Sequence, residues 1–94
     1  MASATARHIL VASKEECEAL KADIQGGGTD FAQAAKEHSQ CPSGAEGGNL
    51  GSFAPGQMVP EFDQVVFSES VGEVHGPVQT QFGFHLIEIT SRED

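Results

Sequence analysis

The spacing of hydrophobic and polar residues in the first quarter of the chain predicts a strand followed by a helix. Residues 6–11 are mostly aliphatic and β-branched, which favours an extended strand with His8 near its middle. Ser13 is followed three residues later by Glu16, a capping-box pattern that predicts the start of a helix. That helix is expected to end near Gln25, because three consecutive glycines follow it.

A second helix is predicted from Thr29 or Asp30 to about Ser39. Its apolar residues recur at helical spacing and are expected to form the side that faces the core. These are Phe31, Ala34 and Ala35, with His38 as a fourth candidate.

The second half of the chain predicts a loop, one more helix and two strands. Residues 40–56 are rich in Gly, Ser and Pro and are expected to be loop, interrupted by an extended piece from Leu50 to Phe53. Pro60 suits the first turn of a helix over 61–67. Strands are predicted over 74–78 and 84–90, and Pro77 places the first of these at a strand end or a sheet edge.

The order of these elements predicts an α+β fold, with a mostly antiparallel sheet in one domain over residues 1–94. There is no internal repeat and no linker-like segment.

Composition and charge exclude several classes of partner. The formal net charge is −9 and the five basic residues lie far apart, so the clustered cations that a nucleic-acid backbone requires are missing. No stretch approaches the roughly 20 apolar residues that span a bilayer, and the first residues resemble no signal peptide. We therefore expect a protein of the cytoplasm that binds neither nucleic acid nor membrane, and we expect a monomer.

The two cysteines are expected to be reduced and to have different roles. Cys17 shares a helix face with Leu20 and Ile24, which indicates a small buried hydrophobic residue. Cys41 lies in the glycine-rich loop, three residues after His38. A thiol near histidines is compatible with a nucleophile, with a metal site or with neither, and this spacing alone does not decide.

The glycine-rich loops do not predict a nucleotide site. The three glycines at 26–28 follow a helix rather than a strand, and no glycine is followed by Lys-Ser or Lys-Thr. We read them as turns.

Two histidines lie in the middle of the predicted first and last strands. If those strands are neighbours, His8 and His85 can point to one face of the sheet and share hydrogen bonds. Such a pair is either structural or catalytic, and the pattern leaves both open. Close to them in the predicted fold are apolar residues that form either part of the core or a shallow pocket for a peptide side chain. They are Leu50, Phe53, Met58, Phe62 and Phe82.

Three segments resemble the parvulin family of peptidyl-prolyl cis-trans isomerases. The first is RHILV at 7–11, the second is HSQCPSGAEGGNLGSFAPGQMVPEFD at 38–63, and the third is GPVQTQFGFHLIEI at 76–89. Together they extend over essentially the whole chain, and the likeness is greatest to the small stand-alone bacterial parvulins of the rotamase C type. The resemblance implies a four-stranded antiparallel sheet surrounded by three to four helices.

The resemblance also implies roles for individual residues. It assigns a catalytic network to His8, Cys41, Thr80 and His85. It assigns the pocket for the substrate proline to Leu50, Met58 and Phe62, and we expect the apolar Phe53 to contribute to substrate binding as well. Gln57 falls on a position that contacts the substrate backbone, and Phe82 on the wall beside the residue that precedes proline. It implies no cofactor and no metal, and it implies that aspartate occupies the Cys41 position in some relatives.

The expected activity is therefore isomerisation of X-Pro bonds in flexible polypeptides without a covalent intermediate. Phosphate-directed parvulins carry a basic cluster after the first strand, whereas this chain has only Lys14 there, so we expect a neutral or hydrophobic residue before proline. Two alternatives remain. One is a noncatalytic module that binds proline-containing peptides as a chaperone, and the other is a thiol hydrolase built on Cys41.

Overall fold

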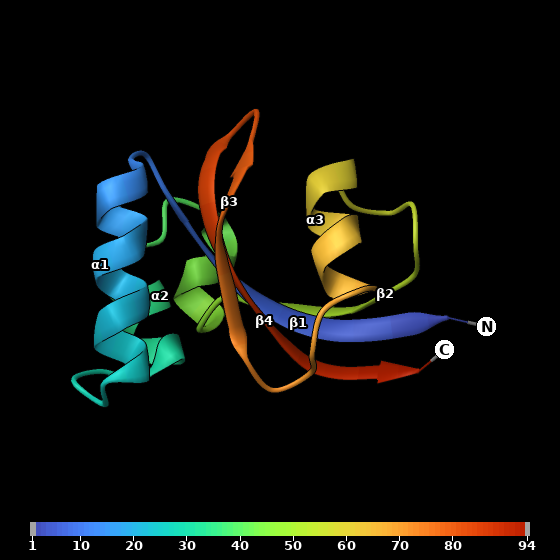
Figure 1. Ribbon diagram of the computed structural model, residues 1–94, viewed down its shortest axis with the longest axis horizontal. Helices are drawn as coiled ribbons and strands as arrows, with labels where there is room; N and C mark the ends of the chain where they lie inside the picture. The colour runs from blue at the N-terminus through green and yellow to red at the C-terminus, as the bar shows by residue number, and fades with distance from the viewer. Residues whose placement is uncertain (1, 94) are drawn as a thin grey trace.

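The computed structural model describes residues 2–93 and shows an antiparallel sheet of four strands in the order β2-β1-β4-β3 (Figure 1). The α+β fold predicted from the sequence is confirmed. The elements are β1 (Ser3–Val11), α1 (Lys14–Gln25), α2 (Phe31–His38), a short 3-10 helix η1 (Pro42–Glu46), β2 (Asn49–Phe53), α3 (Pro60–Val66), β3 (Val74–Thr80) and β4 (Gly83–Glu93).

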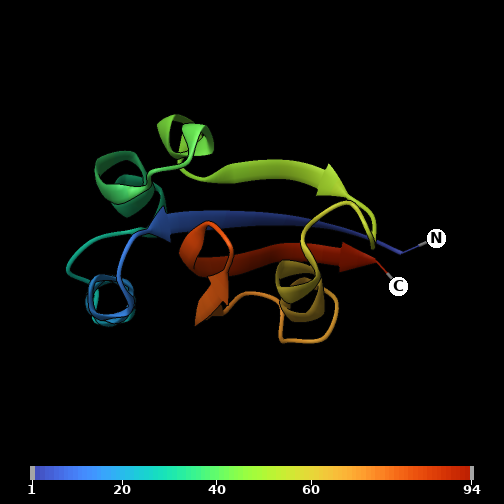
Figure 2. The ribbon, with the colours of Figure 1, turned by 90° about the horizontal axis from the view of Figure 1, so that it is seen from above.

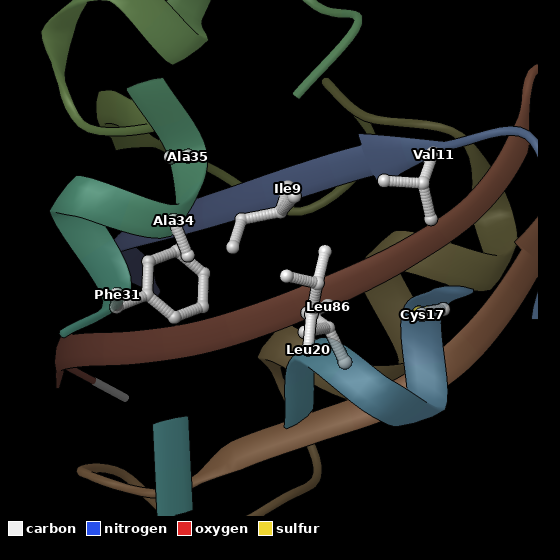
Figure 3. Close-up of a cluster of buried hydrophobic side chains, with 8 residues drawn as sticks. All are labelled: Ile9, Val11, Cys17, Leu20, Phe31, Ala34, Ala35 and Leu86. Carbon is white, nitrogen blue, oxygen red and sulfur yellow. The ribbon is translucent and has the colours of Figure 1, made fainter. Parts of the chain in front are cut away.

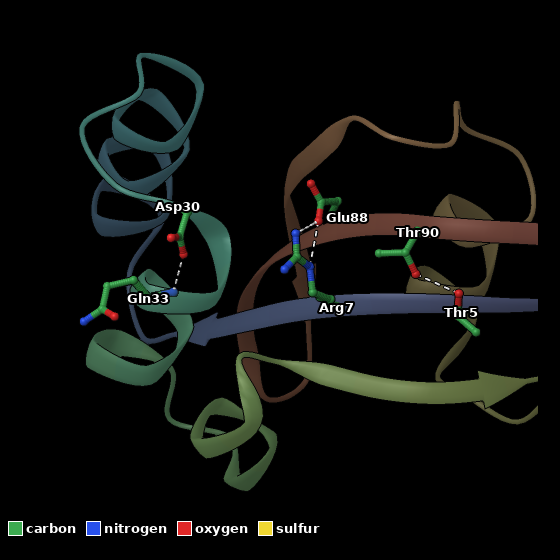
Figure 4. Close-up of polar contacts among 6 residues, drawn as sticks. All are labelled: Thr5, Arg7, Asp30, Gln33, Glu88 and Thr90. Carbon is green, nitrogen blue, oxygen red and sulfur yellow. Dashed lines mark hydrogen bonds and ion pairs between the residues drawn. The ribbon is translucent and has the colours of Figure 1, made fainter.

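Side-chain caps fix the starts of the two longer helices where the sequence predicts them. The Ser13 hydroxyl accepts a hydrogen bond from the Glu16 N–H at 3.1 Å, which satisfies one of the free donors of the first turn of α1. The Asp30 carboxylate accepts from the Gln33 N–H at 2.7 Å and caps α2 in the same way (Figure 4). Both predicted helices are therefore confirmed to within a residue or two at each end.

Successive side chains of a strand point to opposite faces, and the sheet uses this alternation to build two separate cores. Figures 1 and 2 show α1 and α2 beside one half of the sheet and α3 beside the other half. The α1/α2 core, drawn in Figure 3, consists of Ile9, Val11, Cys17, Leu20, Phe31, Ala34, Ala35 and Leu86. The α3 core consists of Ala4, Ala6, Phe53, Phe62, Val66 and Ile87.

Cys17 is a buried part of the first core, as its position on the helix predicts. Its side chain has no solvent exposure, and burial together with the negative charge of Glu18 raises the pKa of the thiol to about 11. A thiol with such a pKa stays protonated and behaves as a small hydrophobic group.

The remaining predictions of local structure were partly right. The strand that contains Pro77 lies at the edge of the sheet, as expected for a residue without an N–H. His38 is exposed at the end of α2, so the prediction that it faces the core was wrong. The segment predicted as loop after Gln40 contains η1, whose five residues, PSGAE, give no sequence signal for a helical turn.

The face of the sheet opposite α3 is polar over the part that the α1/α2 core leaves uncovered. Here Arg7 pairs with Glu88 on the adjacent strand and lies over the Phe31 ring, 5.1 Å from its centre, while Thr5 and Thr90 share a hydrogen bond of 2.7 Å (Figure 4). Arg7 alternates with His8 along β1, so the guanidinium and the imidazole lie on opposite faces.

Candidate active site

The antiparallel pairing of β1 and β4 brings the two strand histidines together. His8 lies opposite Ile87 and His85 lies opposite Leu10, so the histidines are diagonal neighbours on one face of the sheet. Their rings are stacked, with centroids 5.2 Å apart and an angle of 15° between the planes, and the two Nδ1 atoms are 3.0 Å apart. A hydrogen bond at this distance requires that one Nδ1 carries a proton and that the other does not.

Burial keeps both imidazoles neutral at physiological pH. The side chains of His8 and His85 are only 6% and 4% exposed. Loss of hydration, and secondly repulsion by His85, lowers the pKa of His8 to about 4. Loss of hydration also lowers the pKa of His85. The pair therefore acts through hydrogen bonds rather than through a net charge.

The outer nitrogens of the pair bind two hydroxyl groups. The Thr80 hydroxyl at the end of β3 is 2.8 Å from His85 Nε2, and the Ser43 hydroxyl in η1 is 3.0 Å from His8 Nε2. Ser43 also donates a hydrogen bond to Cys41 Sγ at 3.4 Å. The structure thus brings the four predicted catalytic residues into one network, in which Ser43 links Cys41 to the histidines, and their catalytic role stays a prediction.

An apolar cavity of about 390 Å³ lies directly over this network, which is a size typical of ligand sites. Its lining comes from β1, η1, β2, α3 and β4, together with the loops before η1 and α3 and the turn before β4. The lining residues are His8, Leu10, Gln40, Cys41, Pro42, Leu50, Met58, Val59, Phe62, Phe82 and His85. No Asp, Glu, Lys or Arg side chain borders the cavity, and the two histidines that do are neutral. An uncharged group is therefore the natural occupant.

Phe62 connects the cavity to the histidine pair. Its ring meets His8 edge-on at 5.7 Å and His85 edge-on at 6.0 Å. Phe62 is only 3% exposed, so it forms the floor, whereas Phe82 is 63% exposed in the turn between β3 and β4 and forms part of the rim. The predictions that Leu50, Met58, Phe62 and Phe82 border one pocket agree with this arrangement.

Two predicted pocket residues lie elsewhere. Phe53 is 5% exposed and packs edge-on against Phe62 at 6.1 Å and Phe67 at 6.0 Å, so it supports the floor from behind. The prediction that Phe53 lines the pocket was wrong, because Phe53 is enclosed in the α3 core, where it packs behind Phe62. The Gln57 side chain accepts a hydrogen bond from the Ala54 N–H at 2.7 Å and shapes the loop before Met58. A contact between Gln57 and substrate stays a prediction.

Sequence reasoning missed Ser43 and four lining residues. Leu10 could have been predicted as a lining residue, because it follows His8 by two positions in a strand and therefore lies on the same face. Gln40, Pro42 and Val59 lie in loops or at helix starts, where no periodicity reports their direction. Ser43 stands two positions after Cys41, but only the turn of η1 aims its hydroxyl at His8.

Within residues 2–93, no three His, Cys, Asp or Glu side chains are grouped in a way that would hold a metal ion. The helices of the same part of the chain are all too short or too polar to cross a bilayer.

Comparison with known proteins assigns the chain to one family. The family model of the rotamase domain, described as the PPIC-type peptidyl-prolyl isomerase (PPIase) domain, matches residues 4–91. The chain belongs to this family. The match contains the histidine pair, Cys41, Thr80 and the apolar cavity, so the parvulin resemblance inferred from the sequence is confirmed.

Individual relatives of this PPIC-type domain include both large and small proteins. The chain is 45% identical over 89 residues to the foldase protein PrsA of Geobacillus kaustophilus, with 94% of this chain and 31% of the relative covered. A crystal structure of the peptidylprolyl isomerase PrsA from Bacillus anthracis superimposes with a TM-score of 0.94 at 35% identity, with 99% of this chain and 43% of that chain covered. The solution structure of the parvulin NmPin of Nitrosopumilus maritimus has a TM-score of 0.86 at 35% identity, with 97% and 98% covered.

The chain spans about a third of the length of the curated relatives that it matches. The small parvulin NmPin, by contrast, is matched over almost its whole length. The likeness is therefore one between isomerase domains.

The lowered pKa of His8 predicts that acid destabilises the fold. The unfolded chain takes up a proton on His8 near the usual pKa of 6.5, whereas the folded domain resists protonation until about pH 4. Between these values the unfolded state binds more protons, so stability is lost as pH falls through this window, by on the order of 3 kcal/mol from His8.

Urea unfolding of the wild type and of His8→Gln at pH 7 and pH 4.5 measures this contribution. We expect a smaller loss between the two pH values in His8→Gln than in the wild type. Equal losses, or an NMR titration of the His8 ring with its midpoint near 6.5, would contradict the assignment.

Proposed function

We propose that this PPIC-type domain catalyses cis-trans isomerisation of X-Pro peptide bonds by binding the proline ring in the cavity over Phe62. The observation that carries the proposal is an apolar cavity with the neutral pair of His8 and His85 at its base and the Cys41 thiol on its wall. The family to which the chain belongs, and the peptidylprolyl isomerase PrsA and the parvulin NmPin that it resembles, support the same function.

The chemistry of the reaction matches such a site. Rotation about a peptide bond must overcome roughly 18–20 kcal/mol, because twisting breaks the amide resonance. The twisted amide has less charge separation than the planar one, so it loses less when it leaves water for an apolar cavity. A site that favours the twisted form by only about 4 kcal/mol accelerates rotation about a thousandfold, and no bond needs to break.

The apolar side chains of Leu50, Met58 and Phe62 would hold the proline ring while the preceding carbonyl rotates. Cys41 and the two histidines border the same cavity and would define the electrostatic surroundings of that carbonyl. Covalent attack by Cys41 is not required for this mechanism, and the wall around the thiol contains no Lys or Arg that would promote a thiolate.

The charges around the cavity support a neutral or hydrophobic residue before proline. None of the lining residues is Lys or Arg, and Arg7 is engaged with Glu88 on the other face of the sheet. Lys21 donates to the Gly76 carbonyl at 2.9 Å, away from the cavity. The formal net charge of −9 adds a general repulsion against a phosphorylated residue.

We further propose that the domain acts as a monomer in a reducing compartment such as the cytoplasm. The free thiols of Cys17 and Cys41 fit such a compartment. Size-exclusion chromatography and fractionation of cells that express the full-length protein measure these two properties.

The isomerase proposal predicts that shortening Met58 lowers catalysis. Met58→Ala removes half-buried apolar surface from the proline wall, which we expect to cost about 1.4 kcal/mol of transition-state binding and hence about tenfold in kcat/KM. The assay follows isomerisation of an Ala-Leu-Pro-Phe peptide. Val71→Ala serves as the matched control, because Val71 is an exposed apolar residue outside the cavity and should leave the rate unchanged.

A wild-type protein that binds the peptide but fails to accelerate its isomerisation would favour the noncatalytic chaperone module instead. Proline-limited refolding of an unrelated protein provides the second readout, since an enzyme accelerates the slow phase at substoichiometric amounts.

The noncovalent mechanism predicts that Cys41→Asp remains an isomerase. Aspartate keeps an acceptor for the Ser43 hydroxyl but cannot form a thiohemiacetal-like adduct, so we expect kcat/KM to fall by no more than about tenfold. Complete loss of activity in a folded Cys41→Asp protein, together with an adduct trapped on the wild-type thiol, would establish the nucleophile.

The charge distribution predicts discrimination against phosphate. A peptide with phosphoserine before proline should have a lower kcat/KM than its counterpart with unmodified serine, because none of the residues that line the cavity is a Lys or Arg that could pair with the dianion. The deficit should shrink as salt is raised, since salt screens long-range repulsion. Faster turnover of the phosphorylated peptide would overturn this specificity.

A further inference from the structure

The cavity extends along β1, and its two ends have different linings. β2 pairs with residues 4–7 of β1, so Leu50 borders the cavity beside that part of the strand, where α3 also places Phe62. Leu10 pairs with His85 a few positions further along β1, at about 3.3 Å per position, and borders the other end. Figures 1 and 2 show the same order, with α3 near the N-terminal part of β1 and the connection from α2 to η1 near its C-terminal end.

The second end of the cavity is formed by Leu10, Gln40 and Phe82. The Gln40 N–H donates to the Leu10 carbonyl at 2.7 Å, which holds the connection after α2 against β1. The turn that carries Phe82 approaches from the other side, since a Cβ atom at Gly83 would lie 3.3 Å from Leu10 Cδ1. Three separate parts of the chain therefore meet at this end.

The backbone at Gln40 is fixed, whereas its side chain is free. The Ser39 hydroxyl accepts hydrogen bonds from the Leu10 N–H at 3.1 Å and from the Cys41 N–H at 3.3 Å, so the residues on both sides of Gln40 are tied down. The Gln40 side chain is exposed, and within residues 2–93 it has no hydrogen-bond partner. A rigid backbone thus presents an uncommitted amide at the border of the cavity.

Gln40 differs in this respect from the other polar residues of the lining. His8, His85 and Cys41 all have hydrogen-bond partners within the described part of the chain. An amide has both donors and an acceptor but carries no charge, so it can bind a polar group of either kind without favouring a cation or an anion strongly. Since the lining holds no Asp, Glu, Lys or Arg, nothing else at this end selects by charge.

We propose that Gln40 is the specificity-determining residue for the side chain that precedes proline, and that its neutral amide makes uncharged side chains the preferred ones. This assignment rests on the proposed isomerase function. There the rotating carbonyl belongs to the residue before proline and faces Cys41 and the histidines. Gln40 is the chain neighbour of Cys41, and Leu10 lies opposite His85, so the side chain of that same residue reaches the second end. Leu10 and Phe82 contact its apolar part and Gln40 its tip.

Three variants test whether the charge at position 40 selects the substrate. Gln40→Lys and Gln40→Glu place opposite charges at the border of the cavity. Gln33→Lys is the matched control, because Gln33 is an exposed glutamine of α2 outside the cavity and the net charge changes by the same amount. Its amide donates to Glu37 at 3.2 Å, a contact that a lysine can keep. The substrates are Ala-Xaa-Pro-Phe peptides in which Xaa is Leu, Glu or Lys.

The measured quantity is the ratio of kcat/KM for the Glu peptide to kcat/KM for the Lys peptide, because general effects on folding or catalysis cancel in this ratio. In Gln40→Lys we expect roughly a threefold gain for the Glu peptide and a threefold loss for the Lys peptide, as an exposed charge pair allows. The ratio should therefore rise about tenfold, and in Gln40→Glu it should fall about tenfold. Gln33→Lys should change it by less than about twofold, because salt screens a charge outside the cavity.

Two results would overturn the proposal. One is a ratio that changes no more in Gln40→Lys than in Gln33→Lys. The other comes from peptides that carry Glu or Lys after proline, in the form Ala-Leu-Pro-Xaa. If their ratio responds to Gln40→Lys more strongly than that of the first set, Gln40 contacts the residue after proline instead.

Binding of the same peptides, followed by NMR titration, separates this proposal from the proposed function. If the wild type accelerates none of the peptides, the isomerase function fails, and the ratio of Kd values then decides on Gln40. A reversal of that ratio between Gln40→Lys and Gln40→Glu supports its contact with the residue before proline, and an unchanged ratio refutes it. If the wild type is active and neither ratio moves, the isomerase function stands and the role of Gln40 fails.

Discussion

The hydrogen bond between the two Nδ1 atoms of His8 and His85 is the constraint on which the rest of the site depends. Two imidazoles that face each other at 3.0 Å can share a hydrogen bond only if at least one is neutral. The surroundings remove the charge from both, because the sheet, Phe62 and the flanking strands exclude water. Everything else in the network follows from having one proton on each ring.

The register of the central strands makes this pair possible. β1 and β4 form the middle of the sheet, with an edge strand on either side, so both histidines are screened from solvent laterally as well as from above. Each of the two cores supports one face of these central strands. The α1/α2 core holds the far face of the two central strands, and the α3 core places Phe62 edge-on against both rings. Cys41 and Met58 lie in loops that hydrogen bonds hold in place. The Ser43 hydroxyl donates to Cys41 Sγ, and the Asp63 carboxylate accepts from the Gly56 N–H in the loop before Met58.

The sequence predicted the regular elements well because their signals are local. The caps at Ser13 and Asp30, the β-branched run of the first strand and the proline of the edge strand each depend on a few neighbouring residues. Phe53 and Ser43 show where local signals end. Phe53 and Phe62 are both apolar and near the same loop, and only their packing in the α3 core decides which one reaches the cavity. The role of Ser43 depends on a 3-10 turn that brings residues 35 positions apart together.

The neutrality of the histidine pair is also what the proposed chemistry requires. In a planar amide the carbonyl oxygen carries partial negative charge, and this charge decreases as the bond twists. A protonated imidazole beside that oxygen would stabilise the planar form more than the twisted one, and would raise the barrier. Hydrogen-bond donors of modest strength orient the carbonyl without that penalty, since they carry no net charge. Because its pKa is about 4, His8 stays neutral throughout the physiological pH range and does not stabilise the planar amide. The same loss of hydration that destabilises the fold in acid therefore keeps the floor of the cavity uncharged.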